Sequence, residues 1–194
     1  NNLYLQIWGG DFNIDAQGNL INNVWLQHNP LVKDNFISET GDLWLTKRID
    51  GTSSTIVFLE QINLTTKQNK IYPVDFKGTY NHEQHILQDQ NGRLWIGGFN
   101  GFFAVFDPEN GQFKEFNINN RVEKKLSLDN YTTALYNDNS GTVWIGTQEG
   151  FAKIESKNIL TTAPVITWYN NDPNNKTSLN NNNVSTFLED PTDQ

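Results

Sequence analysis

The chain has 194 residues, of which 36% are hydrophobic and 12% aromatic, so it can bury a core as one module. Its formal net charge of −8 argues against nucleic acid and anionic membranes as partners, because both select basic surfaces. No apolar run approaches the roughly 20 residues of a membrane-spanning helix, so we expect no direct membrane insertion, and any anchor or export signal would lie outside this segment.

A short sequence pattern recurs along the chain, and each copy predicts a strand, a tight turn and a second strand. The earliest copy is the weakest: Tyr4 takes the position that later copies give to Trp, and the Gly pair after it comes two residues late. The second copy, residues 38–46, contains Trp44 but has Ser38 in place of the turn Asp. Both copies predict strands of the same repeat. Because they depart from the pattern, they do not fix where one blade ends and the next begins.

The next two copies, residues 89–98 (DQNGRLWIGG) and 138–147 (DNSGTVWIGT), are nearly identical. The Asp carboxylate is expected to accept hydrogen bonds from backbone N–H groups ahead of it, and the Gly supplies a positive φ. The bulky residues that follow suit a buried strand, and the small residues after them let a neighbouring sheet approach. The predicted structural residues of the repeat are Trp44, Asp89, Gly92, Trp95, Asp138, Gly141, Trp144 and Asp190.

The spacing of the repeat predicts the fold. Its three Trp residues are 51 and 49 residues apart, and self-similarity at such a period is typical of stacked four-stranded blades. We therefore expect an all-β fold, a β-propeller of four-stranded antiparallel blades with about four blades in residues 1–194. The expected blades are residues 3–37, 38–88, 89–137 and 138–183. Residues 184–194 are expected to form the first strand of a following blade in a larger, seven-bladed type of ring, or of a blade that closes a four-bladed ring.

The pattern Asp-x-x-Gly-x-Leu-Trp-Ile-Gly-Thr-x-x-Gly-Phe resembles the two-component regulator propeller repeat. The polar spacer from Trp168 through Asp172-Pro173 and Ser178-Leu179 to Asn183-Val184 is similar to the spacer between blades in that family. The resemblance implies the periplasmic sensor region of a hybrid two-component histidine kinase, in which propellers recognise a ligand, often an oligosaccharide. The implied partners are an oligosaccharide or other small ligand, further propeller blades and a membrane-anchored kinase in the same protein. A homodimer is left open.

Candidate ligand-binding residues stand at the entrance of the first strand of each blade. Counting back eight residues from the turn Asp gives an Asn in three blades, followed by a residue that varies. The Asn suits a cap of the strand entrance, and the varying residue suits a ligand contact at the mouth of the propeller. The candidates are Asn81, His82, Asn130, Tyr131, Asn182 and Asn183.

The sequence predicts no catalytic residue, no cofactor and no metal site. The segment His82-Glu-Gln-His85 is one residue short of a helical zinc motif and lies at a strand entrance. A carbohydrate-active propeller enzyme, of the glycosidase or lyase type, is the first alternative, because the turn resembles the Asp-box of sialidases. The turn is one residue longer than that motif, however, and the chain contains only three Arg residues. A scaffold for protein–protein interaction is the second alternative.

Overall fold

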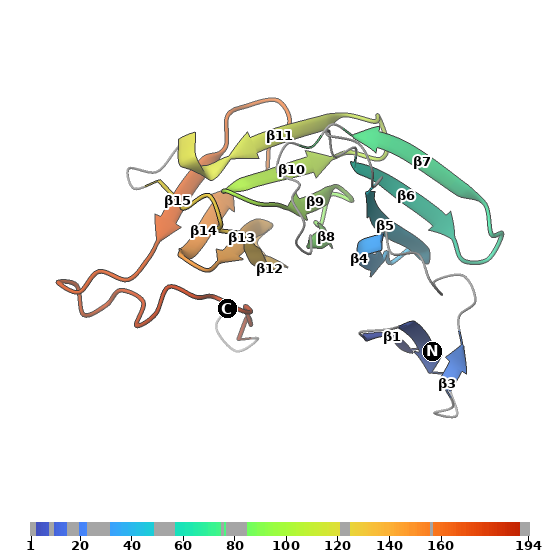
Figure 1. Ribbon diagram of the computed structural model, residues 1–194. Coiled ribbons are helices and arrows are strands. Elements are labelled where there is room, and N and C mark those ends of the chain that lie inside the picture. The colour runs from blue at the N-terminus through green and yellow to red at the C-terminus, as the bar shows by residue number, and fades with distance from the viewer. Residues whose placement is uncertain are drawn as a thin grey trace. The chain divides into compact units, whose positions relative to one another are not determined.

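The structure is a computed structural model, and it describes residues 3–7, 10–14, 20–22, 32–48, 57–74, 76, 85–120, 125–155 and 157–190. The chain divides into two compact units, Asn1–Val32 and Lys33–Gln194. Among the described residues, every regular element is a β-strand except one short 3-10 helix, η1 (Ile118–Asn120). The expectation of an all-β fold is confirmed (Figure 1).

The first unit contains an antiparallel sheet of three strands in the order β1-β2-β3. The strands are β1 (Leu3–Ile7), β2 (Gly10–Ile14) and β3 (Leu20–Asn22). Tyr4, which holds the Trp position of the repeat, lies in β1 opposite Asn13. The expected first blade, residues 3–37, extends beyond this sheet into a strand that pairs elsewhere.

The second unit contains three four-stranded antiparallel sheets in which strands that follow each other in sequence lie side by side. The first is β4 (Val32–Ile37), β5 (Asp42–Arg48), β6 (Val57–Asn63) and β7 (Asn69–Val74). The second is β8 (Ile86–Gln88), β9 (Leu94–Gly97), β10 (Phe102–Phe106) and β11 (Phe113–Asn117). The third is β12 (Thr132–Asn137), β13 (Thr142–Thr147), β14 (Gly150–Glu155) and β15 (Val165–Tyr169). The sheets are the four-stranded blades that the repeat predicts.

The sheets and the expected blade ranges are out of phase by one strand. The ranges 38–88 and 89–137 run from one turn motif to the next, so each joins three strands of one sheet to the first strand of the following sheet. The strand before the turn Asp pairs with the strand after it, as β8 does with β9. The packing unit of the fold therefore begins one strand before the turn motif.

The turn motif holds its Trp through the Asp side chain. Asp89 Oδ1 accepts hydrogen bonds from the backbone N–H groups of Asn91 and Arg93, at 2.9 and 3.1 Å. Its Oδ2 accepts one from Trp95 Nε1 at 2.9 Å. Gly92 has a φ of 76°, a conformation that residues with a Cβ adopt at a cost. One carboxylate thus links the turn to the indole ring.

Two buried clusters join the three sheets of the second unit. In the first, Trp44 shares a cluster with apolar residues of the next sheet, four of which come from the second and third strands of that sheet. In the second, Trp95 packs with residues at the same four positions of the sheet after that. These residues come from the second and third strands: Leu94, Ile96, Ala104 and Phe106 in one sheet, and Val143, Ile145, Ala152 and Ile154 in the next. Trp44 and Trp95 therefore fill matching positions between consecutive sheets.

Residues 184–190 differ from expectation, because they form no regular strand in the structure. They nevertheless lie against the third sheet: the Val184 N–H donates to Thr147 O at 3.0 Å, as the Thr132 N–H donates to Gly98 O at 2.9 Å. A segment counts as a β-strand only when a neighbouring strand pairs with it, and none of the described strands pairs with residues 184–190. Residues 191–194 lie outside the described residues.

Candidate functional site

The loops that join the strands gather at two opposite ends of the sheets, because neighbouring strands are antiparallel. One end, which we call the loop end, carries the hairpins 98–101 and 147–150 and the connections 118–131 and 170–183 between sheets. The other, the turn end, carries the tight turns 89–92, 107–111 and 138–141. The described candidate ligand-binding residues all belong to the loop end.

Asn130 links two successive sheets at the loop end. Its backbone C=O accepts a hydrogen bond from Asn100 N at 2.6 Å, and its side-chain Oδ1 accepts one from Gln148 N at 3.2 Å. Within the described part of the chain, its Nδ2 has no hydrogen-bond partner. The residue is 1% exposed, so in this arrangement it caps a strand entrance and offers no surface to a ligand.

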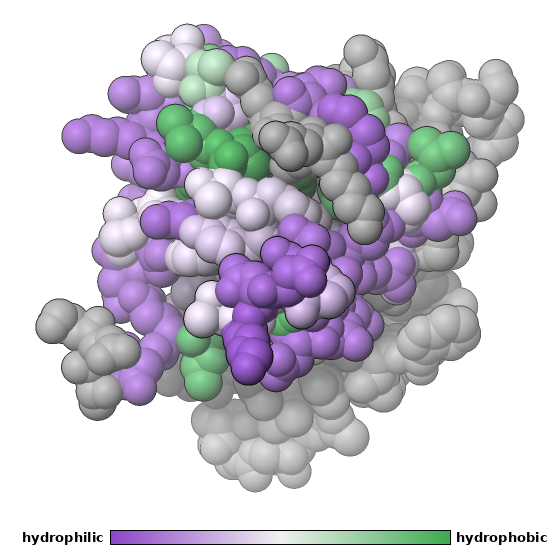
Figure 2. Space-filling view, turned by 90° about the vertical axis from the view of Figure 1, so that its left-hand side faces the viewer, coloured by the Kyte–Doolittle hydropathy of each residue, from purple (hydrophilic) through white to green (hydrophobic). Residues whose placement is uncertain are grey.

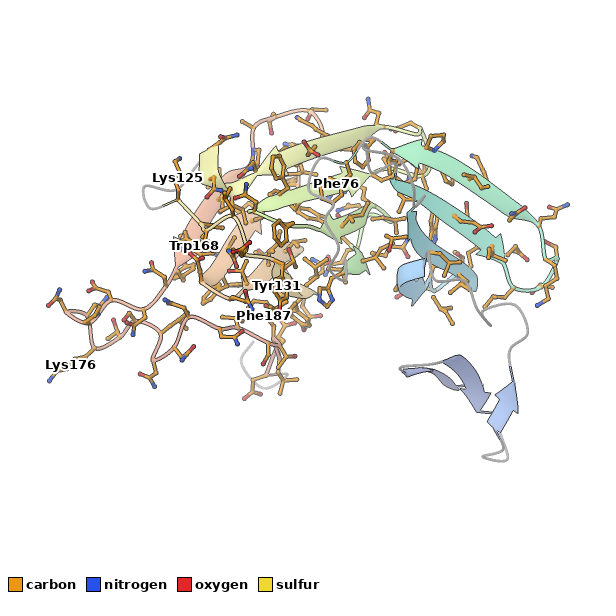
Figure 3. All side chains as sticks on the ribbon, viewed as in Figure 1. Phe76, Lys125, Tyr131, Trp168, Lys176 and Phe187 are labelled. Atoms are coloured by element: carbon orange, nitrogen blue, oxygen red, sulfur yellow. The ribbon has the colours of Figure 1, made fainter. Side chains whose placement is uncertain are left out.

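Tyr131 and Asn183, the residues after the two described Asn caps, are more open. Tyr131 is half-buried and forms a β-bridge with Phe99 of the neighbouring hairpin (Figure 3). Asn183 is exposed, and its backbone N–H donates to Asn181 Oδ1 at 2.8 Å. Asn182 is half-buried, with its Oδ1 accepting a hydrogen bond from Asn171 N at 2.6 Å. Asn81 and His82 lie outside the described residues.

An amide cluster at the loop end could not be found from the repeat. Asn119 Nδ2 donates to Asn100 O at 3.2 Å, and its Oδ1 accepts a hydrogen bond from Leu126 N at 2.7 Å. Asn100 has a φ of 52°, which Asn tolerates better than most residues. These bonds attach the connection 118–131 to the hairpin 98–101. The only sequence signal was Asn100-Gly101, a hairpin dipeptide.

Ser127 and Glu149 make a second attachment at the loop end. The Ser127 N–H donates to Glu149 Oε1 at 3.1 Å, and the Ser127 hydroxyl donates to the same oxygen. Ser127 lies in the connection that enters the third sheet, and Glu149 lies in the hairpin between β13 and β14 of that sheet. Hydrogen bonds therefore hold the connection between the second and third sheets at both of its ends. Tyr131 lies at the end of this connection, next to the hydrogen-bonded Asn130.

The connection that follows β15, residues 170–183, extends from the third sheet and returns to the sheets (Figure 1). Its Asn and Asp residues bond mainly to one another and to local backbone, as where Asp172 Oδ1 accepts from Asn174 N at 2.9 Å. Figure 3 shows Lys176 at the outer tip of the loop. The abundant Asn residues of this loop therefore form its turns.

The turn end contains a carboxyl group whose pKa is shifted. Partial burial alone would raise the pKa of Asp138, but hydrogen bonds from Ser140, Trp144 and Thr142 outweigh it and hold the pKa below its ordinary value of 3.8. The folded state therefore favours the ionised carboxylate, and the stability gained is present above about pH 4 and lost as pH falls through the lowered pKa.

We expect Asp138→Asn to flatten the acid limb of the stability curve. Between about pH 5 and pH 2, the free energy of unfolding should fall less in the variant than in the parent, because the variant has no carboxylate to protonate. Urea denaturation at several pH values measures the slope. Asn139→Ala, at an exposed position of the same turn, removes no ionisable group; it is the control and should leave the slope unchanged.

Neither a metal cluster nor a membrane-spanning helix occurs among the described residues. Within that part of the chain, no group of three or more His, Cys, Asp and Glu residues could hold a metal ion. No helix found there is long and apolar enough to cross a membrane.

Four-stranded sheets that stack through matching Trp positions define a segment of a β-propeller. Residues 77–100 and 126–149 match the family model described as two component regulator propeller. The first segment contains β8, the turn motif and β9 of the second sheet. The second segment contains the corresponding elements of the third sheet, which are β12, the turn motif and β13. Two segments of the chain therefore match the two component regulator propeller repeat, as the sequence pattern indicates.

Solved structures share this fold at low sequence identity. The extracellular domain of the hybrid two component system BT4673 from B. thetaiotaomicron is 18% identical with a TM-score of 0.67, covering 98% of this chain and 24% of that one. PorZ, a surface component of the type-IX secretion system of Porphyromonas gingivalis, is 15% identical with a TM-score of 0.67, covering 98% and 28%. Virginiamycin B lyase from Staphylococcus aureus is 15% identical with a TM-score of 0.56, covering 85% and 50%.

This chain thus spans about a quarter of the length of the two-component ectodomain that it resembles. A comparison with curated protein sequences gives no match.

Proposed function

We propose that this chain is part of the extracytoplasmic, ligand-sensing propeller of a hybrid two-component sensor histidine kinase, located in the periplasm, and that its ligand is an oligosaccharide. The observation that carries the proposal is the two component regulator propeller pattern in two successive sheets, at residues 77–100 and 126–149. The shared fold with the extracellular domain of a hybrid two component system supports the same assignment.

The ligand would bind at the loop end, where Tyr131, Asn182 and Asn183 are the described candidates with accessible surface. An aromatic ring and an amide suit a sugar, because the ring covers an apolar face and the amide bonds hydroxyl groups. The net charge of −8 favours neutral sugars over anionic ones. The attachments through Asn130, Asn119 and Glu149 would keep the site pre-organised, which lowers the entropic cost of binding.

Signalling would follow from a difference in affinity. A ligand that binds one arrangement of the propeller more tightly shifts the population toward it, and the kinase in the same protein responds to that shift. This segment would bind its ligand without catalysing a reaction. Its protein partners would be further blades of the propeller and a second copy of the protein.

Isothermal titration calorimetry with cellohexaose, xylohexaose and mannohexaose tests the assignment. We expect one of them to bind and Tyr131→Ala to weaken the binding by up to about tenfold, since a stacked aromatic ring is worth about 0.5–1.5 kcal/mol beyond the area that it buries. The control is Glu109→Ala at the turn end, where the side chain is exposed, and it should bind as the parent does. Binding that Tyr131→Ala leaves unchanged would contradict this site.

A carbohydrate-active enzyme is the second candidate function, because virginiamycin B lyase, which shares the fold, is an enzyme. Chromatography of the same sugars after incubation separates the two functions. A sensor leaves each hexasaccharide intact, whereas a glycosidase or lyase releases shorter products.

A further inference from the structure

Each four-stranded sheet of the second unit ends in an outer strand with one unpaired side. The outer strands are β7, β11 and β15, and no other described strand pairs with any of them on that side (Figure 1). The unpaired side of such a strand presents backbone N–H and C=O groups, which bind another extended chain unless the strand carries residues that prevent pairing. The sequences of the three outer strands therefore indicate which side is open to a partner.

Two of the outer strands contain residues that prevent pairing. In β7, Lys70 places a charge on the strand, and Pro73 has no N–H to donate. In β11, Lys114 and Glu115 are both charged, and Lys114 Nζ also donates to Leu160 O, in the segment before β15, at 3.1 Å. Charged residues and proline are common means by which proteins protect the edge of a sheet.

The third outer strand, β15, contains no such residue. Its sequence, Val-Ile-Thr-Trp-Tyr, consists of β-branched and aromatic residues, which favour strands. Residues 158–171 include no charged side chain, although the whole chain has a net charge of −8. Val165, Thr167 and Tyr169 are exposed. Figure 2 shows the molecule from the side on which β15 lies, and near-white and green residues interrupt the purple surface there.

The direction of the backbone groups in β15 follows from the pairing of its sheet. Thr142 O accepts a hydrogen bond at 3.0 Å from the N–H of the residue that follows β12, so the backbone groups of Thr142 point away from β14. In an antiparallel sheet this direction alternates along each strand, and two facing residues point either both toward each other or both away. Thr142 faces Glu155, and Glu155 faces Val165. The backbone groups of Val165 therefore point into the sheet, and those of Ile166 and Trp168 point to its unpaired side.

Two copies of β15 match each other when they pair antiparallel about a two-fold axis at Thr167. Ile166 of each copy then faces Trp168 of the other, and the two residues exchange N–H and C=O groups in both directions. Every outward-pointing backbone group of the two strands is thereby bonded. Val165 of one copy faces Tyr169 of the other, and pairs of a β-branched and an aromatic residue stabilise antiparallel strands.

We propose that β15 is the surface on which a second copy of this chain binds, by antiparallel strand pairing about a two-fold axis at Thr167. A second copy is the occupant because its own β15 matches the outward-pointing groups and brings no charge to the interface. Pro164, directly before the strand, has no N–H, so pairing stops there and the interface is small. Because small interfaces give weak complexes, we expect a dimer that forms as the protein concentration rises. The inference goes beyond the proposed function: it names a surface and no ligand, and a failure to bind sugar would leave it unaffected.

A disulfide trap tests the pairing directly, because the chain contains no cysteine. Thr167 would face itself across the axis as a pair without backbone hydrogen bonds, in which the Cα atoms are about 4.5 Å apart. That separation suits a disulfide. Mild oxidation of Thr167→Cys in the 194-residue protein should therefore give a covalent dimer on a non-reducing gel. The control is Thr177→Cys, exposed in the loop 170–183, which should form a dimer far more slowly.

Charged residues at position 167 test the two-fold symmetry. In Thr167→Lys, and likewise in Thr167→Glu, two like charges would face each other across the axis. Sedimentation equilibrium should show that each change raises the dissociation constant of the dimer by up to about fivefold. A one-to-one mixture of the two variants brings opposite charges together and should associate at least as tightly as the parent. Thr177→Lys is the control and should dimerise as the parent does.

Hydrogen exchange in the parent covers failure of a variant to fold. The Ile166 and Trp168 amides should exchange more slowly as the protein concentration rises. The Thr167 amide, which points into the sheet, should exchange slowly at every concentration.

A dimer that leaves the Ile166 and Trp168 amides unprotected, or that Thr167→Lys does not weaken, would overturn the proposal in favour of another face of the molecule. A monomer at every concentration would also overturn it. Protection of the same two amides by an added Thr-Val-Thr-Val peptide would then assign the unpaired side of β15 to an unrelated extended chain.

Discussion

Asp89→Ala is expected to lower the free energy of unfolding by about 3–5 kcal/mol, the cost of removing one partner of a buried ion pair. Asp89 is 4% exposed, and its Oδ2 lies 2.8 Å from the guanidinium of Arg93, which is itself buried. The same oxygen holds the Trp95 indole, and Oδ1 holds two backbone N–H groups. The substitution therefore removes the acceptor of a buried charge and of three N–H donors together.

Asp138→Ala is the matched variant one repeat later. Asp138 makes the corresponding bonds to Trp144 and to the backbone of the turn, but Thr142 stands where the other repeat has Arg93. Asp138 is also more exposed than Asp89. Urea denaturation should show a loss of about 1–3 kcal/mol for this variant, clearly below that of Asp89→Ala. Equal losses would mean that the buried charge of Arg93 does not depend on Asp89.

Gly97→Ala should destabilise the protein by about 3 kcal/mol, at the upper end of overpacking costs. A Cβ at this position would lie 2.5 Å from Cγ2 and 2.7 Å from Cβ of Thr132, in the first strand of the next sheet. Thr132 is buried, and its backbone N–H is bonded to Gly98 O at 2.9 Å, so it has little room to move. The variant should therefore separate the second and third sheets.

Gly146→Ala is the control for this effect, because Gly146 holds the same position of the repeat. Its Cβ would lie 3.0 Å from Val184 O and 3.1 Å from Val184 Cγ1, a milder clash with a segment that no second strand holds in place. Thermal unfolding should therefore show a smaller loss for Gly146→Ala than for Gly97→Ala. A larger loss for Gly146→Ala would contradict this ranking of the two interfaces.

The periodic Trp predicted the fold because a fixed large ring at each interface leaves a strong signal in the sequence. The same signal is weak in the first unit, where Tyr4 replaces Trp. It also placed a first strand before each turn Asp, but the blade ranges 38–88 and 89–137 were counted from the turn motif and are therefore out of phase with the sheets by one strand. Residues 184–190 have the sequence expected of a strand, but they form no strand because none of the described strands pairs with them.

The candidate site was predictable only in part. Counting from the turn Asp indicated Asn130, which lies two residues before β12, but the count could not tell that Asn130 is 1% exposed. That burial comes from the hairpins of two sheets, which are remote in sequence. Ser127, Glu149 and Asn119 were missed because the repeat leaves their positions variable and gives no sign of which loops bond to each other.

Backbone NMR of the protein during a titration with the hexasaccharide that binds tests the central claim most directly. We predict chemical-shift changes at the loop end, at the amides of Asn100, Tyr131, Gln148 and Asn183, with none at Gly92, Gly111 and Gly141 of the turn end. Shifts concentrated at the turn end, or none with any of the three sugars, would contradict the account of this chain as the sugar-binding part of a sensor.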